Sequence, residues 1–185
     1  GFNSNTAQWV QGKIGGALSL DGTNDFVQVP SSSSLNTDSE ITISAWVFSN
    51  NFDRGQFQKF VGKGSFNVRQ YAFIPEKDTG KLGFFIHSTE QMYWTKSSVP
   101  LVNGQWSHVV GSYDGEKMRS FINGANSSTA AIGSIEIRQT NELLAAGRLR
   151  SHNGEYFVGK LDDLRIYNRA LSAVEVQQLH LDAPP

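Results

Sequence analysis

Short apolar segments separated by turn residues run along most of this 185-residue chain, and they limit its fold more than any other feature. Pairs such as Asp114-Gly115 and Asn123-Gly124 supply the positive φ angles that tight hairpin turns need. No helical pattern separates these segments, so the sequence predicts an all-β antiparallel sandwich or barrel. The strands are expected at residues 17–20, 26–29, 41–48, 59–62, 71–75, 81–87, 92–96, 106–113, 117–122, 143–148 and 158–167.

One helix is expected near the end of the chain, over residues 171–179. Ser172 is its predicted N-cap, and Glu175 three residues later completes a capping box. The proline-containing residues 182–185 are typical of the start of a linker. The sequence therefore predicts one domain over residues 1–181.

Charge and composition exclude several classes of partner and of stabilising bond. The formal net charge of −1 argues against duplex nucleic acid or an anionic membrane as the main partner. No apolar run is long enough to cross a bilayer, so membrane insertion is not expected. Cysteine is absent, and neither disulfides nor thiolate metal sites can hold the fold together.

Several stretches together resemble one known family. The most specific is GKLDDLRIYNRALSAVEVQQL at residues 159–179, and the others are GKIGGALSLDGTNDFVQVP (12–30), ITISAWV (41–47), WSHVVGSYDG (106–115) and FINGA (121–125). They resemble the laminin-G-like group of the concanavalin A-like lectin/glucanase folds, in the bacterial branch found beside carbohydrate-active enzymes. The resemblance implies a two-sheet antiparallel jelly roll with one short C-terminal helix, whose function lies on a curved face and its bordering loops.

Two acidic clusters are candidates for a structural Ca²⁺ site. Asp21, Asn24 and Asp25 offer three oxygen-bearing side chains within one turn, and Asp162 and Asp163 offer two more in the closing strand. Calcium prefers such oxygen ligands. The resemblance implies that the first and last strands run close together, so the two clusters could meet. The alternative is a simple turn, in which Asp and Asn side chains accept hydrogen bonds from nearby backbone N–H groups.

Aromatic and cationic side chains that alternate along three stretches suggest a sugar-binding surface. Flat rings stack on the apolar faces of pyranoses, and arginine or lysine beside them favours an acidic or sulfated glycan, although neutral sugars remain an alternative. Tyr93 and Trp94 are adjacent and must point to opposite faces, and Trp94 is expected to point outward. The candidate binding residues are Arg69, Tyr71, His87, Trp94, Lys96, Arg148, Arg150, Asn153 and Tyr156.

Catalysis finds little support in the sequence. Asp162 and Asp163 are adjacent and point to opposite faces, unlike the facing carboxylates of glycosidases. Arg69, Tyr71 and His87 could in principle form the active site of a small polysaccharide lyase. The hypothesis favoured by the resemblance is a non-catalytic carbohydrate-binding module, in a secreted or cell-surface bacterial protein and covalently linked to a polysaccharide-degrading catalytic domain. The first alternative is a protein-interaction or adhesion domain, and a small lyase or glycosidase is the second.

Overall fold

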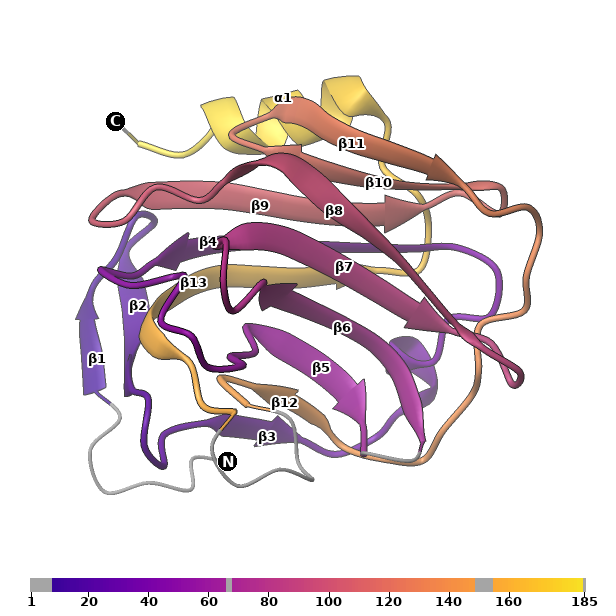
Figure 1. Cartoon of the computed structure of the whole chain (residues 1–185), viewed down its shortest axis with the longest axis horizontal. Helices are drawn as coiled ribbons and strands as arrows, with labels where there is room; N and C mark the ends of the chain where they lie inside the picture. Colours follow the sequence, from indigo (N-terminus) through magenta and orange to yellow (C-terminus); the bar gives the residue numbers. More distant parts are fainter. Residues whose placement is uncertain (1–7, 66–67, 149–154, 185) are drawn as a thin grey trace.

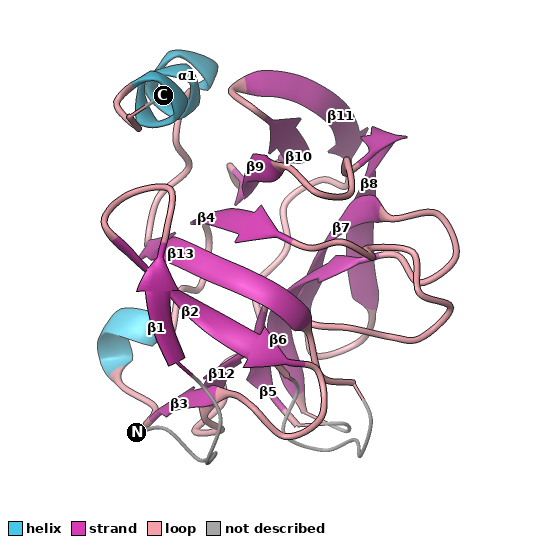
Figure 2. Ribbon diagram, turned by 90° about the vertical axis from the view of Figure 1, so that its left-hand side faces the viewer, coloured by secondary structure: helices cyan, strands magenta, loops and turns pink. Residues whose placement is uncertain are grey.

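The computed structural model describes residues 8–65, 68–148 and 155–184. Two antiparallel sheets lie face to face in these residues, with a short helix outside one of them (Figures 1 and 2). The arrangement confirms the predicted sandwich. In the described ranges no helix is long and apolar enough to pass through a membrane.

The sheet farther from the viewer in Figure 1, called the back sheet below, has seven strands. Their spatial order is β1 (Gln8–Gln11), β2 (Gly16–Asp21), β13 (Val158–Tyr167), β4 (Ile41–Phe48), β9 (Trp106–Tyr113), β10 (Lys117–Ile122) and β11 (Ala125–Ala131). The closing strand β13 therefore pairs with β2 near the beginning of the chain, as the resemblance implied.

The sheet nearer the viewer, called the front sheet below, has six strands. Their order is β3 (Val27–Val29), β12 (Leu144–Ala146), β5 (Val61–Gly64), β6 (Arg69–Pro75), β7 (Lys81–His87) and β8 (Met92–Pro100). A single 3₁₀ turn, η1 (Ser33–Leu35), precedes β4 among the described residues.

The hydrophobic core fills the space between the two sheets. Inward residues of both sheets are buried there, and Phe60, Phe73 and Phe84 form a chain of edge-to-face ring contacts. Gly111 on β9 faces Phe84 of the opposite sheet, and a β-carbon at Gly111 would lie 2.5 Å from the Phe84 ring. The absence of a side chain at Gly111 thus permits the sheets to approach at this point.

The helix α1 (Ala173–Leu181) packs on the outer side of the back sheet (Figure 2). Ser172 and Glu175 form the predicted capping box: Ser172 Oγ accepts from the Glu175 N–H, and the Glu175 carboxylate accepts from the Ser172 N–H. Val176 is buried against Val110 and Phe121 of the back sheet. The outer side of the front sheet carries no such helix among the described residues (Figure 2).

Candidate functional site

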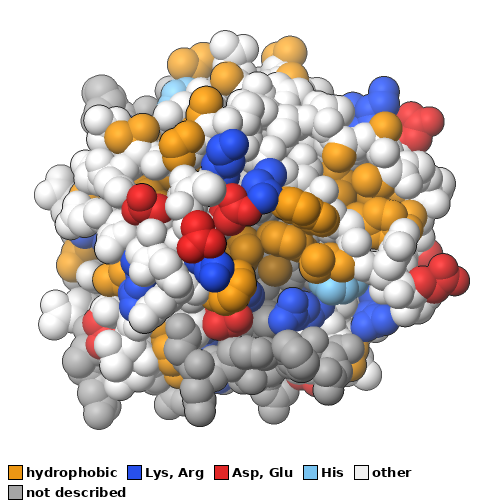
Figure 3. Space-filling model, viewed as in Figure 1, with side chains coloured by type: hydrophobic (Ala, Val, Ile, Leu, Met, Phe, Trp, Pro, Cys, Tyr) orange, Lys and Arg blue, Asp and Glu red, His pale blue; other side chains and the backbone are white. Residues whose placement is uncertain are grey.

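A cleft of about 380 Å³ lies on the outer side of the front sheet. Alternation along the strands produces its floor, because Phe73, Phe84 and Ile86 point into the core and their neighbours point outward. Figure 3 shows hydrophobic side chains gathered near the centre of this side, with Lys and Arg around them. The lining residues are Phe57, Lys59, Arg69, Ala72, Ile74, Phe85, His87, Met92 and Glu155.

Two parallel aromatic rings, called the aromatic platform below, lie at this cleft: Phe85 lines it and Trp94 lies next to Phe85. Phe85 and Trp94 are cross-strand partners on β7 and β8, and their rings are nearly parallel, with 6.0 Å between centroids and 8° between planes. Trp94 is 45% exposed. A β-carbon at Gly83 would lie only 2.8 Å from the Phe85 ring, so a glycine there lets this ring lie along the strand. The expected outward orientation of Trp94 is confirmed, whereas Tyr93 packs against the core.

Lys96 adds a cation to one end of this platform. Its Nζ lies 4.5 Å from the centroid of the Trp94 ring, within the range of a cation–π contact. The same ammonium forms an ion pair with Glu76. Within this ion pair Lys96 Nζ donates a hydrogen bond to the Glu76 carboxylate, and that bond is the main reason why the pKa of Glu76 lies below its usual value.

A second set of polar side chains lines the opposite part of the cleft. Lys59 Nζ lies 3.2 Å from a Glu155 carboxylate oxygen and 5.7 Å from the centroid of the Phe57 ring. Burial lowers the pKa of Lys59, and Glu155 opposes that effect. Phe57 is half exposed, so its ring gives the cleft a further aromatic wall.

His87 lies at the end of the cleft where β7 finishes. Burial, together with the nearby charges of Arg69 and Arg138, lowers the pKa of this histidine to about 4. The imidazole is therefore neutral at pH 7. It can donate one hydrogen bond and accept another.

A β-bulge separates the orientations of Arg69 and Tyr71, which alternation had placed on one side of the strand. The register of β6 shifts here: Arg69 pairs with Gly64 while Tyr71 pairs with Lys63, and Gln70 is the extra residue. Such a bulge reverses the facing of the residues beyond it. Arg69 consequently lines the cleft, and Tyr71 is buried in the core with its hydroxyl donating to the Leu35 carbonyl oxygen.

The remaining predicted binding residues lie apart from the cleft lining or outside the described residues. The Arg148 guanidinium carbon is 3.7 Å from the Phe26 ring centroid, and Arg148 Nη1 donates to the Tyr156 hydroxyl at 3.1 Å. Arg148 and Tyr156 thus pack with Phe26, the residue before β3. Arg150 and Asn153 fall outside the described residues.

The two acidic clusters do not meet. Asp21 pairs with Val158, whereas Asp162 lies four residues further along β13 and pairs with Trp46. Four strand residues correspond to roughly 13 Å. In the ranges that the structure describes, no three His, Cys, Asp or Glu side chains converge as a metal site would require. Asp21 and Asp162 thus lie at separate register positions, although β2 and β13 are neighbours.

Each cluster has hydrogen bonds of its own. Asp21 Oδ1 accepts from the N–H groups of Thr23 and Asn24, at 2.7 and 3.2 Å, which is the turn chemistry of the alternative interpretation. Asp25 Oδ2 accepts from the Asp21 N–H at 3.0 Å. Asp162 and Asp163 make other contacts: Asp162 Oδ2 accepts from the Ile14 N–H, and Asp163 Oδ1 accepts from Arg165 Nε. In this structure Asp162 and Asp163 thus have polar partners outside the Asp21–Asp25 loop.

Sequence reasoning missed Phe57 and Phe85, the aromatic residues of the cleft lining. The adjacent pair Phe84-Phe85 within a predicted strand carried a signal, since one of two neighbouring rings must point outward. Phe57 lies in an irregular segment before β5, where no periodicity predicts a direction.

Solved structures show the same fold. The binding domain of Paraclostridial Mosquitocidal Protein 1 superposes with a TM-score of 0.76 at 20% identity, over 97% of this chain and 47% of that one. Domain 4 of AbnA, a GH43 extracellular arabinanase from Geobacillus stearothermophilus solved with arabinotriose, gives 0.75 at 22% identity, over 96% and 82% of the two chains. The botulinum neurotoxin serotype G binding domain gives 0.71 at 15% identity, over 98% and 46%.

This chain thus spans about half the length of the two toxin binding domains. No curated protein sequence matches it significantly. A family model does match, over residues 21–177, and its description is the Concanavalin A-like lectin/glucanases superfamily. Since that match extends over most of the sequence, the chain belongs to the concanavalin A-like lectin/glucanase superfamily, and the resemblance seen in its sequence motifs is confirmed.

Proposed function

We propose that this chain is a non-catalytic carbohydrate-binding module that holds a glycan in the cleft of the front sheet. The observation that carries the proposal is the parallel Phe85–Trp94 pair, in which the Trp94 ring is exposed and Phe85 lines a cleft with polar groups. Sugar rings have apolar faces that stack on such surfaces, while their hydroxyls need hydrogen-bond partners. Phe57 and His87 line the same cleft and supply a second ring and a neutral hydrogen-bonding group.

The geometry of the candidate catalytic groups supports a binding role over a catalytic one. A lyase would need Arg69, His87 and Tyr71 to converge on the substrate, yet Tyr71 is buried on the opposite side of β6. A glycosidase would need two facing carboxylates about 5–9.5 Å apart across an open cleft. Asp162 is buried against the Ile14 N–H, and neither it nor Asp163 lines the front-sheet cleft.

The proposal extends to the context of the module. We infer a secreted or cell-surface protein in which this domain is covalently linked to a polysaccharide-degrading catalytic domain. The similarity to domain 4 of an extracellular arabinanase supports that context. In it, the module would concentrate its attached enzyme on an insoluble glycan, because linked binding events raise the effective concentration.

A structural calcium forms the last part of the proposal, and it is confined to the loop of Asp21, Asn24 and Asp25, which holds the oxygen donors calcium prefers. Calcium should then raise the melting temperature, and Asp21→Asn should abolish that rise. Asp162→Asn should destabilise the fold equally with calcium or with EDTA, because Asp162 binds a backbone N–H. If calcium does not change the melting temperature of the wild type, the loop binds no structural calcium and is a turn only.

Isothermal calorimetry against a panel of plant and bacterial oligosaccharides tests the binding function. We expect at least one ligand to bind, and Trp94→Ala and Phe85→Ala to weaken it at least tenfold, as aromatic residues at the centre of a binding site usually do. Trp9→Ala is the matched control, since Trp9 is 68% exposed on the back sheet. If no glycan binds the folded chain, the adhesion alternative replaces this proposal, and a protein partner should be sought.

A further inference from the structure

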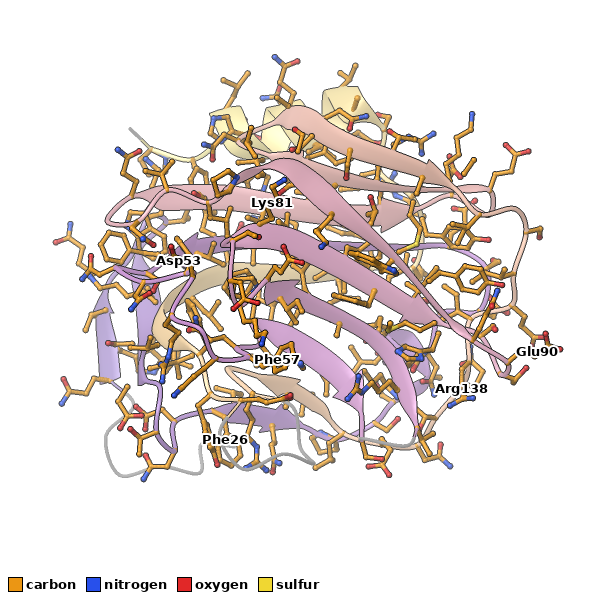
Figure 4. All side chains as sticks on the ribbon, viewed as in Figure 1. Phe26, Asp53, Phe57, Lys81, Glu90 and Arg138 are labelled. Carbon is orange, nitrogen blue, oxygen red and sulfur yellow. The ribbon has the colours of Figure 1, made fainter. Side chains whose placement is uncertain are left out.

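Cationic side chains form a row along the cleft. Lys59 and Arg69 both line it, and Arg69 is near enough to Lys59 to lower its pKa. Arg138 lies beside the His87 end of the cleft: its backbone N–H donates to the His87 carbonyl oxygen at 2.7 Å, and its Nη2 donates to the Thr89 carbonyl oxygen at 2.6 Å. Figure 4 shows Phe57 and Arg138 at opposite ends of the region that β5 and β6 cover.

The charges of this row have one predominant sign. Glu155 is the carboxylate among the lining residues, and it lies 3.2 Å from the Lys59 ammonium. Arg69 lines the cleft near His87, and the Arg138 guanidinium, which donates to the Thr89 carbonyl oxygen, adds a second positive charge beside it. Their effect is visible at His87, where both arginines add to burial in lowering the imidazole pKa. Both arginines thus contribute positive charge at the His87 end of the cleft.

The aromatic platform and this positive end are close to each other on one strand. Phe85 and His87 are two residues apart on β7 and both line the cleft, so they are separated by about 7 Å. A sugar ring stacked on Phe85 would thus place a ring substituent near His87 and Arg69. Arginine suits an anionic substituent there, because its planar N–H groups match the oxygens of a carboxylate or sulfate.

We propose that the Arg69–His87 end of the cleft is an anion subsite, and that the glycan bound by this chain carries a uronate carboxylate or a sulfate ester. This inference rests on the proposed carbohydrate-binding function. The neutral His87 donates a hydrogen bond to the anion, Arg69 and Arg138 supply the charge, and Phe85 with Trp94 holds the apolar face of the sugar.

Calorimetry with three oligosaccharides of matched length tests the subsite: an oligogalacturonate, a sulfated galactan oligomer and a neutral galactan oligomer. We expect one of the two anionic ligands to bind at least tenfold more tightly than the neutral one at low ionic strength, and to lose most of that advantage at high ionic strength, which screens charges. Which anionic ligand binds more tightly distinguishes carboxylate from sulfate.

Arg69→Gln should weaken the affinity for the anionic ligand at least tenfold and leave the weak binding of the neutral ligand unchanged. Arg119→Gln is the matched control, since Arg119 is an arginine of the back sheet paired with Asp114. If Arg69→Gln does not fold, as judged by circular dichroism, Arg138→Gln replaces it.

The outcomes separate the two proposals. Equal affinity for neutral and anionic ligands, or an anionic preference that survives both Arg69→Gln and Arg138→Gln, would overturn the anion subsite and leave the carbohydrate-binding function intact. Failure of all three ligands and of the wider glycan panel would overturn the function itself.

Discussion

His87 shows how single residues of the cleft gain their properties from their neighbours. The histidine was a candidate from its sequence context, but its charge state depends on residues far away in sequence. Arg69 lies on the neighbouring strand β6, and Arg138 lies in the long segment after β11. Together with burial they hold the pKa of His87 near 4, so that the cleft contains a neutral imidazole near two cationic groups.

The affinity for an anionic glycan should rise as the pH falls. The pKa of His87 is about 4 in the free protein, and a bound anion would raise it because the anion favours the imidazolium. A group whose pKa rises on binding takes up protons with the ligand, so we expect affinity to increase about three- to tenfold between about pH 7.5 and pH 5. Calorimetry measures it, and His87→Gln should have a flat profile. The same pH dependence in both proteins would contradict the prediction.

At the scale of secondary-structure elements, the most accurate predictions were for strands that lie inside a sheet and turn one face toward the core. The predicted bounds of β4, β7, β9, β10 and β13 agree with the structure, since apolar alternation and turn pairs define both their faces and their ends. The edge strands β1 and β11 were missed. Their sequences, QWVQ and ANSSTAA, contribute little to the core, and backbone pairing with one neighbour holds them in place.

Irregular strand pairing limited how well the sequence could predict the positions of the site residues. Alternation correctly placed Tyr93 and Trp94 on opposite faces, and Trp94 points outward as expected. The bulge between Arg69 and Tyr71, in contrast, has no characteristic residues from which it could be predicted. The offset between Asp21 and Asp162 is likewise a matter of register between distant strands. Local sequence determines periodicity, whereas register and bulges follow from how whole strands fit together.

Gly111 links the two sheets and provides a test of how tightly they pack. Gly111→Ala should lower the free energy of unfolding by about 1–3 kcal/mol, because the new methyl group would overlap the Phe84 ring in a closed core. Gly16→Ala is the matched control on β2, since its nearest neighbour would be at an ordinary 3.6 Å. Urea unfolding measures both. A loss at Gly111 no larger than that at Gly16 would show that the sheets can move apart at little cost.

The contact between α1 and the back sheet should weaken in acid. His108 on β9 stacks 5.9 Å from His180 of α1, and its Nε2 lies 2.9 Å from Ser44 Oγ. Burial, with the charges of His180 and Arg165, lowers the pKa of His108 to about 4. Burial and Lys13 also lower the pKa of His180. Protonation of either ring would therefore oppose docking of the helix.

The sign of the effect follows from the unfolded chain, in which histidine binds its proton near pH 6.5. Because the pKa of His108 is depressed in the folded protein, its contribution to stability is present above pH 6.5 and is lost as the pH falls toward 4. We expect a loss of about 2 kcal/mol over this range. His108→Gln should lose correspondingly less, measured by urea unfolding at each pH. Parallel curves for wild type and variant would refute the assignment to His108.

At the scale of the whole molecule, the sandwich separates two kinds of surface. The back sheet buries part of its outer side under α1, where Val176 and Leu171 pack on Val110 and Phe121. In the part of the chain that the structure describes, no helix covers the outer side of the front sheet, and the cleft lies there. The cleft and the attachment of the final helix thus lie on opposite sides of one core (Figure 2).

This separation predicts that a large group joined after α1 leaves the cleft accessible. We expect a fluorescent protein fused to the C-terminal end to change the glycan affinity less than twofold, because α1 leads the chain away along the back sheet. The matched fusion carries the same fluorescent protein inserted in the β7–β8 hairpin, between Ser88 and Gln91, whose turn adjoins His87 and Met92 of the cleft. That insertion should weaken binding at least tenfold, while circular dichroism confirms an intact sandwich. Weakened binding by the C-terminal fusion alone would mean that the glycan extends around the molecule to the side of α1, and the cleft would then be only part of the binding surface.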